Sequence, residues 1–491
     1  MQYILLATLL FFGFNNADLQ TEPQQGNRIA ISIEQGNIPT NSQLQSLLEL
    51  GIVLIETDQV DELPASLSNR FFLLLKSGSR YTTPYQINNN FTRYRQEITE
   101  RFQESNERYP NRIVAVSVFE YPYELNPEFQ QSATILADSL QIQIQVPLYF
   151  KSLSTSSDLI PSGFQFVSNR VHFLMNDSAV SSSTHFIPGD DERQTLLTLE
   201  KQLNESLRFD DSLIILPAEW LLNKLEENPD FQFIIQKYLN GEQVTIPLPN
   251  QSADNPGVNW SVLLLFLIWI SFVLHYKYQP VYSQSAARYF TNHTFFVTDI
   301  MENRLRNPLP GIYLLLQHAL ITGLFFYVSA QVLFSENGLQ ILAHHFPSII
   351  WLESVLGSFF LIGIILALIL QSVSILWIYL LNNKLRYFSQ VINLYSWPLH
   401  INLFSVTLLV MFNQVGFGEK WIMALGIIFG LVWFFSFNIA AIDGAKFLDK
   451  YRILYLLATV GLHVLIVVII IWFVLFSASI TDPFRFAISA P

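Results

Sequence analysis

The 491-residue chain contains no cysteine. This absence excludes disulfide bonds, thiolate metal sites, cysteine nucleophiles and lipid attachment to an N-terminal cysteine. Exported eukaryotic domains of this size carry disulfides more often than bacterial ones. The lack of cysteine therefore favours a bacterial envelope protein.

Charged residues are few, at 13% of the chain, and unevenly distributed. The segment Asp18–Val258 holds 16 Lys and Arg against 31 Asp and Glu, whereas the part from Asn259 onward holds 11 against 8. The first half is therefore acidic and soluble in character, and the second half is apolar. An acidic domain repels anionic polymers, so nucleic acid is not an expected partner. No motif in the sequence indicates a cofactor.

The N-terminal residues Tyr3–Phe14 form a short apolar run, YILLATLLFFGF. A run of this length is too short to cross a bilayer comfortably, but it is typical of the core of a signal peptide. Cleavage is expected after Ala17. The basic residues that usually precede such a core are missing, so an uncleaved N-terminal anchor is the alternative.

Short apolar runs alternate with amphipathic stretches through residues 18–245. Runs without strict polar alternation are typical of strands buried on both faces of a parallel sheet. Eight such strands favour a (β/α)8 barrel over an open sheet. The expected strands are Ile29–Ile33, Ile52–Ile55, Phe71–Leu75, Ile113–Phe119, Ile142–Val146, Phe164–Val167, Val171–Met175 and Ser212–Leu216. The expected helices are Ser42–Leu50, Tyr85–Arg108, Pro127–Leu140, Glu192–Leu207 and Pro217–Leu239.

A linker rich in Pro, Asn and Gly at residues 246–257 leads to six long apolar segments. Each is near the ~20 residues that a transmembrane helix requires. An interfacial helix is expected at Pro347–Ser354, because Glu353 would be costly inside a bilayer. The last residues, 478–491, form a tail. The expected spans are Val258–Tyr276, Ile312–Phe334, Gly357–Leu381, Pro398–Val415, Trp421–Ile442 and Ile453–Ser477.

Basic residues predict the orientation of these spans. If the acidic domain is outside the cytoplasm, the inner loops hold nine Lys and Arg, and the outer loops and tail hold only Lys420 and Arg485. This asymmetry follows the positive-inside rule and agrees with a signal peptide. The expected location is a bacterial inner membrane with the N-terminal domain and the tail extracytoplasmic.

Carboxylates follow several of the predicted strands. Glu34 follows the first strand, Glu56 the second, Glu120 the fourth, and Glu219 lies shortly after the eighth. Asn176 and Asp177 follow the predicted seventh strand. In a (β/α)8 barrel the working residues sit at the C-terminal ends of the strands, so these side chains are expected at one mouth. Two such carboxylates, an acid and a nucleophile or base, are what glycoside hydrolysis requires.

Two stretches of the N-terminal half resemble barrel glycoside hydrolases. IAISIEQGNIPTNSQLQSLLELGIVLIETD is similar to the opening of that family, and RYPNRIVAVSVFEYPYE is similar to its fourth strand, which ends in an Asn-Glu-Pro motif. The resemblance implies that Glu120 is the acid/base. The family's Asn is replaced by Phe119, and the Pro comes one position late, at Pro122. The family's nucleophile follows the seventh strand, whereas Glu219 follows the eighth.

Candidate catalytic residues are therefore Glu120 and Glu219, and candidate substrate-binding residues are Glu34, Glu56, Tyr121 and Trp220. Each has a structural alternative. Glu219 follows Pro217 at the start of a helix, where a carboxylate complements the helix dipole. Aromatic side chains can stack on sugars but pack in cores by default. His185 and its acidic neighbours show no metal-binding spacing, and no metal is expected.

The leading interpretation is a membrane-anchored envelope protein whose barrel binds or hydrolyses glycan. The departures at Phe119 and Pro122 favour binding without catalysis. Six spans exceed what anchoring requires, so a non-enzymatic assembly component that docks an envelope protein is a second interpretation. A small-solute transporter with a sensing domain is a third, since His318, His400 and His463 lie within apolar segments.

Overall fold

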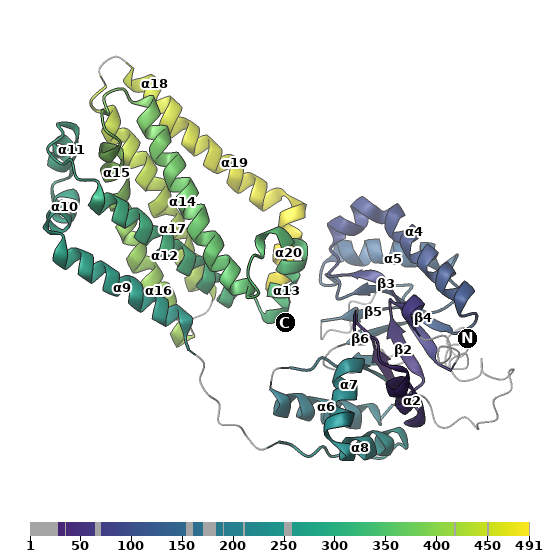
Figure 1. Ribbon diagram of the computed structural model, residues 1–491. Coiled ribbons are helices and arrows are strands. Elements are labelled where there is room, and N and C mark those ends of the chain that lie inside the picture. The colour runs from purple at the N-terminus through teal and green to yellow at the C-terminus, as the bar shows by residue number, and fades with distance from the viewer. Residues whose placement is uncertain are drawn as a thin grey trace. The chain divides into compact units, whose positions relative to one another are not determined.

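The computed structural model (Figure 1) describes residues 28–34, 36–63, 70–153, 161–169, 183–189, 191–209, 212–249, 258–416, 419–448 and 451–490. The chain divides into two compact units, one ending at Asp254 and the other beginning at Asn255. The predicted signal peptide lies outside the described residues.

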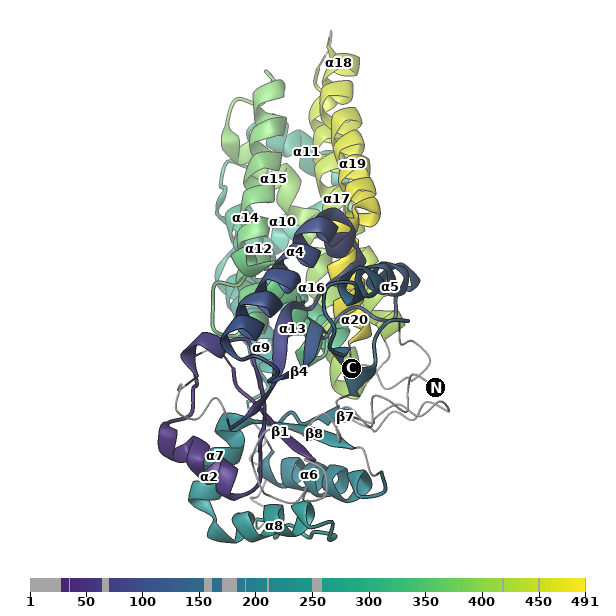
Figure 2. The same cartoon turned by 90° about the vertical axis from the view of Figure 1, so that its right-hand side faces the viewer.

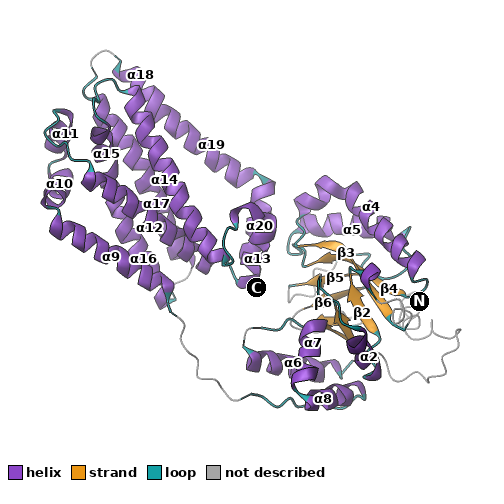
Figure 3. Cartoon of the chain, viewed as in Figure 1, coloured by secondary structure: helices purple, strands orange, loops and turns teal. Residues whose placement is uncertain are grey.

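The first unit is a closed barrel of eight parallel strands in the order β1 to β8. Strand β1 pairs with both β2 and β8, which closes the sheet. The strands form the centre of the unit and the helices lie around them (Figure 3). The predicted barrel is therefore confirmed. The strands are β1 Ile29–Ser32, β2 Leu54–Thr57, β3 Phe72–Arg80, β4 Ile113–Glu120, β5 Leu148–Ser152, β6 Phe166–Asn169, β7 Ser183–His185 and β8 Leu213–Pro217.

Buried strands and capped helices explain this fold. Every residue of β1 and β5 is buried, as expected for strands covered by helices. Thr40 and Gln43 form a capping box at the first helix, and Asn126 caps the helix that begins with Pro127. The helices are α2 Asn41–Glu49, α4 Pro84–Arg108, α5 Pro127–Gln141, α6 Glu192–Ser206, α7 Ala218–Glu227 and α8 Pro229–Leu239.

Gly78 allows β3 and β4 to approach each other closely. The pairing of these strands shifts register between Lys76 and Ser79. A Cβ atom at Gly78 would lie 1.7 Å from the carbonyl oxygen of Val118. Only glycine fits this position, and the shift carries β3 on to Arg80 at the mouth of the barrel.

Three sequence predictions need correction. The fifth strand is β5 at Leu148, and not Ile142–Val146, because Ile142 is the C-cap of α5 and is 83% exposed. The predicted helix Pro217–Leu239 is two helices, since Asn228 is extended and Pro229 begins α8. The seventh strand is β7; the predicted Val171–Met175, with Asn176 and Asp177, lies outside the described residues.

The second unit is helical, and six of its described helical segments are long and apolar enough to cross a membrane. They are Trp260–Tyr278, Leu309–Leu333, Val355–Leu381, Phe388–Val415, Lys420–Ala445 and Arg452–Phe476. The fourth is α15 (Phe388–Ser396) continued through a 3-10 turn into α16 (Ile401–Val415). The sixth is α18 (Arg452–Leu456) continued through a π turn into α19 (Leu462–Phe476). The others are α9 Trp260–Tyr278, α12 Leu309–Leu333, α14 Val355–Leu381 and α17 Glu419–Ala445.

Shorter helices lie at the two ends of this bundle. Helices α10 (Pro280–Thr291) and α11 (His293–Met301) lie at the same end as α18, whereas α13 (Glu336–His345) and α20 (Ala478–Ser489) lie at the other (Figure 2). The prediction of an interfacial helix at Pro347–Ser354 is wrong, because only Pro347–Ile349 are helical there, as a single 3-10 turn. Ser354 instead caps α14 through the Gly357 amide.

Candidate functional site

A cavity of about 460 Å³ opens at the C-terminal ends of the barrel strands. Its volume lies within the range of about 300–1,000 Å³ that is typical of small-molecule sites. Residues from the ends of β1, β3, β4, β5, β7 and β8 line it, together with the start of α7. As far as the described residues show, this end of the barrel holds a cavity, and it is the end where barrel chemistry is expected.

Five of the six sequence-predicted site residues line this cavity: Glu34, Glu120, Tyr121, Glu219 and Trp220. Glu219 accepts a 2.6 Å hydrogen bond from the side-chain amide of Asn37, another lining residue. The Trp220 ring packs on Phe186, with ring centroids 4.9 Å apart. The structure thus brings together three carboxylates and two aromatic rings from distant parts of the sequence.

Glu56 does not line the cavity. It is fully buried inside the barrel, where its carboxylate lies 2.5 Å from the Lys151 ammonium and 3.6 Å from that of Lys76. The Tyr149 hydroxyl donates a 2.7 Å hydrogen bond to it. Burial alone would raise the pKa of Glu56, but the two lysines lower this pKa to about 2. Its position supports a structural role beneath the cavity rather than direct contact with a ligand.

Lys151 belongs both to the buried ion pair with Glu56 and to the lining of the cavity. Its ammonium lies 3.6 Å from the carboxylate of Glu120. Burial alone would lower the pKa of Lys151, but Glu56 and then Tyr121 and Glu120 raise it, so the lysine stays charged. This contact places a positive charge beside Glu120 at the edge of the cavity.

Two tyrosines at the mouth adopt the left-handed backbone conformation. Tyr81 and Tyr121 directly follow β3 and β4, and each has a φ of 52°. This conformation costs about 1–2 kcal/mol for a residue with a bulky side chain. Both rings are buried, and the guanidinium of Arg80 lies 5.0 Å from the centroid of one and 5.5 Å from that of the other. Burial raises the pKa of Tyr121, so its hydroxyl keeps its proton.

Arg80, Lys151 and Asn37 were missed by the sequence analysis. Lys151 lies near the end of β5, a strand that was predicted six residues too early, so it was not recognised as a strand-end residue. Arg80 ends β3 five residues beyond the predicted end of that strand, Leu75, because the bulge at Gly78 extends the pairing. For Lys151 the available signal was a charged residue directly after the apolar run Leu148–Phe150.

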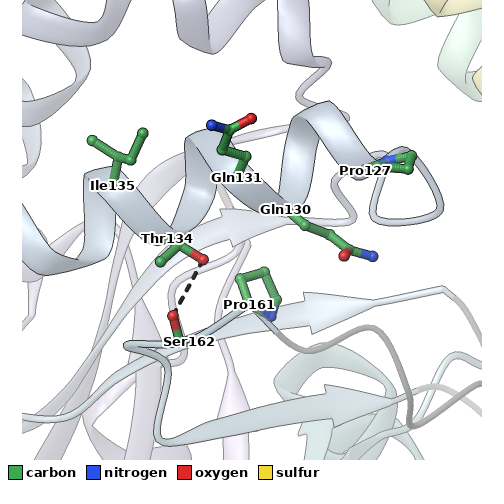
Figure 4. Close-up of a pocket in the computed structure, with 7 residues that line it drawn as sticks. All are labelled: Pro127, Gln130, Gln131, Thr134, Ile135, Pro161 and Ser162. Carbon is green, nitrogen blue, oxygen red and sulfur yellow. Dashed lines mark hydrogen bonds between the residues drawn. The ribbon is translucent and has the colours of Figure 1, made fainter.

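A second hollow of about 450 Å³ lies on the outside of the barrel (Figure 4). It is formed by α5 and the segment at Pro161, and the Ser162 hydroxyl lies 3.5 Å from that of Thr134. The described residues that line it include no charged side chain and no aromatic ring.

In the second unit, His318 is held between two neighbouring helices. The amides of Gln371 and Asn402 lie 2.7 and 3.0 Å from its two ring nitrogens. A neutral imidazole accepts a hydrogen bond at one nitrogen only, so one amide must turn its oxygen to the ring. The Asn402 amide nitrogen also reaches the Phe429 carbonyl at 3.3 Å, so Gln371 is the amide that turns. This arrangement joins three spans through hydrogen bonds.

His400 and His463 also have protein partners. The Nδ1 atom of His400 lies 3.2 Å from the Tyr282 hydroxyl, and that of His463 lies 3.3 Å from the Asn438 side-chain oxygen. Both contacts are made to side chains on neighbouring helices. They provide no specific support for a transport pathway.

Comparisons with known proteins add little to this picture. No protein-family model matches the chain, and no curated protein matches it. Among solved structures, a GH2 beta-galacturonidase from Eisenbergiella tayi, crystallised with galacturonate, matches with a TM-score of 0.30 and 11% sequence identity. The match covers 42% of this chain and 49% of that chain, about half of its length. A similarity at this level carries no argument about activity; the barrel fold stands on the closed sheet itself.

Proposed function

We propose that this protein is a membrane-anchored glycan-binding protein whose ligand occupies the mouth of the barrel. The open cavity lined by Glu34, Glu120 and Glu219 together with Tyr121 and Trp220 carries the proposal. Aromatic faces stack on sugar rings, and carboxylates accept hydrogen bonds from sugar hydroxyls. A cavity of about 460 Å³ has room for a short oligosaccharide end.

Binding is proposed in preference to hydrolysis. A glycosidase needs one carboxylic acid that keeps its proton near neutral pH. Glu120 instead faces the Lys151 ammonium at 3.6 Å, and Phe119 replaces the Asn of the family motif. Glu219 is the second candidate carboxylate of the mouth; it is exposed to solvent and accepts a hydrogen bond from the Asn37 amide. The charges at the mouth therefore favour a ligand that is held rather than cleaved.

The membrane arrangement is part of the same proposal. Six apolar helices support insertion, and the predicted signal peptide and nine-to-two distribution of basic residues support an extracytoplasmic barrel. Such a barrel would meet envelope glycan at the outer face of a bacterial inner membrane.

Binding can be measured by fluorescence on the full-length protein in detergent, with a panel of neutral, acidic and amine-bearing oligosaccharides. Trp220 is the only tryptophan before Trp260, so a ligand-dependent change lost in Trp220→Phe reports on the mouth. Glu219→Gln should weaken binding about 10-fold, because a hydrogen bond to a charged acceptor is lost. Glu242→Gln, an exposed carboxylate outside the cavity lining, is the matched control and should leave the affinity unchanged.

Hydrolysis is tested on the same panel with Glu120→Gln. If Glu120 is the proton donor, turnover should fall by about 10²–10⁴ while binding changes much less. Turnover that survives the substitution would place the acid elsewhere. The proposal fails if no oligosaccharide binds, or if binding is indifferent to Trp220 and Glu219.

A further inference from the structure

Arg80 is a cation of the mouth that forms no close ion pair among the described residues. It lines the cavity, and its guanidinium lies over the buried rings of Tyr81 and Tyr121. In the part of the chain that the structure describes, no carboxylate lies within ion-pair distance of it. Glu120 and Glu34 act on it from farther away: burial alone would lower its pKa, but neighbouring groups, these two carboxylates among them, raise it. Relative to these residues, its N–H donors can serve a ligand.

The two tyrosines border this guanidinium. Both follow their strands in the strained left-handed conformation, and each backbone N–H continues the strand pairing, to the carbonyls of Glu120 and Lys151 respectively. The rings are therefore held by the barrel rather than by a flexible loop. A cation–π contact with a ring uses none of the guanidinium's hydrogen-bond donors as such, so they remain for other partners. A planar fork of this kind matches a carboxylate.

Arg80 differs from the other cation of the lining, Lys151, in having no close carboxylate among the described residues. Lys151 is paired with Glu56 and also faces Glu120 at 3.6 Å. Glu34 and Glu219 are exposed, so water and salt screen their charges. Three carboxylates and two cations line the cavity, so the attraction for an anionic group is a local contact with Arg80 and not the net charge of the acidic domain.

We infer that the mouth binds an acidic glycan and that Arg80 receives the carboxylate of a uronic acid residue. This inference rests on the proposed glycan-binding function and names its ligand class. Arg80 forms a bidentate pair with the sugar carboxylate, while Trp220 and Glu219 contact the uncharged part of the same chain. A neutral glycan would leave the Arg80 donors without an acceptor and would bind more weakly.

The test compares each acidic oligosaccharide with its own uncharged form. Oligoglucuronate and oligomannuronate are titrated into the full-length protein in detergent, alongside their carboxyl-reduced counterparts and a glucosamine oligosaccharide. We expect the acidic form to bind at least 10-fold more tightly than its reduced counterpart. Arg80→Gln should remove this preference, a loss of about 10- to 100-fold for the acidic ligand alone, because hydrogen bonds to charged groups are worth that much. Added salt should reduce the preference.

Two further variants keep the result interpretable. Arg112 stacks on Phe72 at 5.0 Å in the same way, but it precedes β4 and so lies at the opposite end of the barrel. Arg112→Gln should leave both affinities unchanged. Arg80→Lys keeps the charge and loses the fork, so it should retain only part of the preference. It also provides the measurement if Arg80→Gln fails to fold.

The possible outcomes distinguish a failure of the uronate inference from a failure of the proposed glycan binding. Binding of the reduced or glucosamine oligosaccharides with no preference for uronate overturns the inference and leaves glycan binding standing. A uronate preference that Arg80→Gln does not change overturns the assignment to Arg80. Binding of no oligosaccharide overturns both.

Discussion

The buried pair of Glu56 and Lys151 provides a quantitative test of the barrel's interior. Its atoms lie 2.5 Å apart, and the two side chains are 0% and 5% exposed. Removing one partner leaves the other buried charge with only a longer contact at 3.6 Å, to Lys76 for Glu56 and to Glu120 for Lys151, and breaking a buried pair costs about 3–5 kcal/mol. The fall in the pKa of Glu56, from its ordinary 4.5 to about 2, corresponds to about 3 kcal/mol and agrees with that range.

Glu56→Gln and Lys151→Met should therefore each lower the free energy of unfolding by about 3–5 kcal/mol. The double variant should lose much less, because Gln still accepts the Tyr149 hydrogen bond and Met fills the space of the lysine stem. The measurement is urea unfolding of the fragment Asp18–Pro249, followed by the fluorescence of Trp220. Glu97→Gln, which removes the exposed pair with Arg93, is the control and should leave the midpoint unchanged.

The pH dependence of stability provides a second test of the Glu56–Lys151 pair. The pKa of Glu56 is lower in the folded than in the unfolded protein, so its contribution is present above pH 4.5 and is lost as the pH falls towards 2. Wild-type stability should decline over this window more steeply than that of Glu56→Gln. The reasoning would be refuted if the single variants unfolded with free energies within about 1 kcal/mol of the wild type. It would also be refuted if the stabilities of the wild type and Glu56→Gln fell equally with pH.

Three further predictions concern packing, folding and topology. Gly78→Ala should prevent stable folding or cost several kcal/mol, because its Cβ would lie 1.7 Å from a β4 backbone oxygen. Gly189→Ala is the control, since the nearest atom to its Cβ is 3.5 Å away, and it should be tolerated. Thermal unfolding of both variants is the measurement. The fragment Asp18–Pro249 should be a soluble monomer by size-exclusion chromatography, and expression only as aggregate would contradict its independence. A periplasmic reporter should be active after Arg485 and inactive at Lys384, and the reverse pattern would exclude the proposed topology.

The barrel could be predicted because its strands are read from local sequence. Buried parallel strands need continuous apolar runs, and most of the eight runs mark strands within a few residues. The misplaced fifth strand shows the limit of this argument. Ile142–Val146 is as apolar as a strand, but Ile144 packs into the core from a loop, so burial and strand structure did not coincide there.

The carboxylates of the site could be predicted from the sequence, but their charged partners could not. The position of Glu34, Glu120 and Glu219 at or just after the ends of the first, fourth and eighth strands was enough to place them at one mouth, since parallel strands end together. The pairing of cations with carboxylates depends on the register between strands that are distant in the sequence. The sequence alone does not show this register. Lys151 meets Glu120 because β4 pairs with β5 at these two residues. Arg80 reaches the mouth only through the bulge at Gly78.

The sixth apolar span has a different relation to the bundle from the other five. No side chain of α19 is buried, whereas α20, which follows it, packs on α13: Gly338 lies against the Ala487 carbonyl, and the Ser335 hydroxyl donates to that of Ala490. The contact that fixes this end of the chain is thus made beyond the span. The first part of the same segment does pack on the other helices: Tyr455 and Thr459 are buried, and His463 lies 3.3 Å from the Asn438 side-chain oxygen. The exposed remainder of α19 therefore connects two points of contact, one near its start and one at α20.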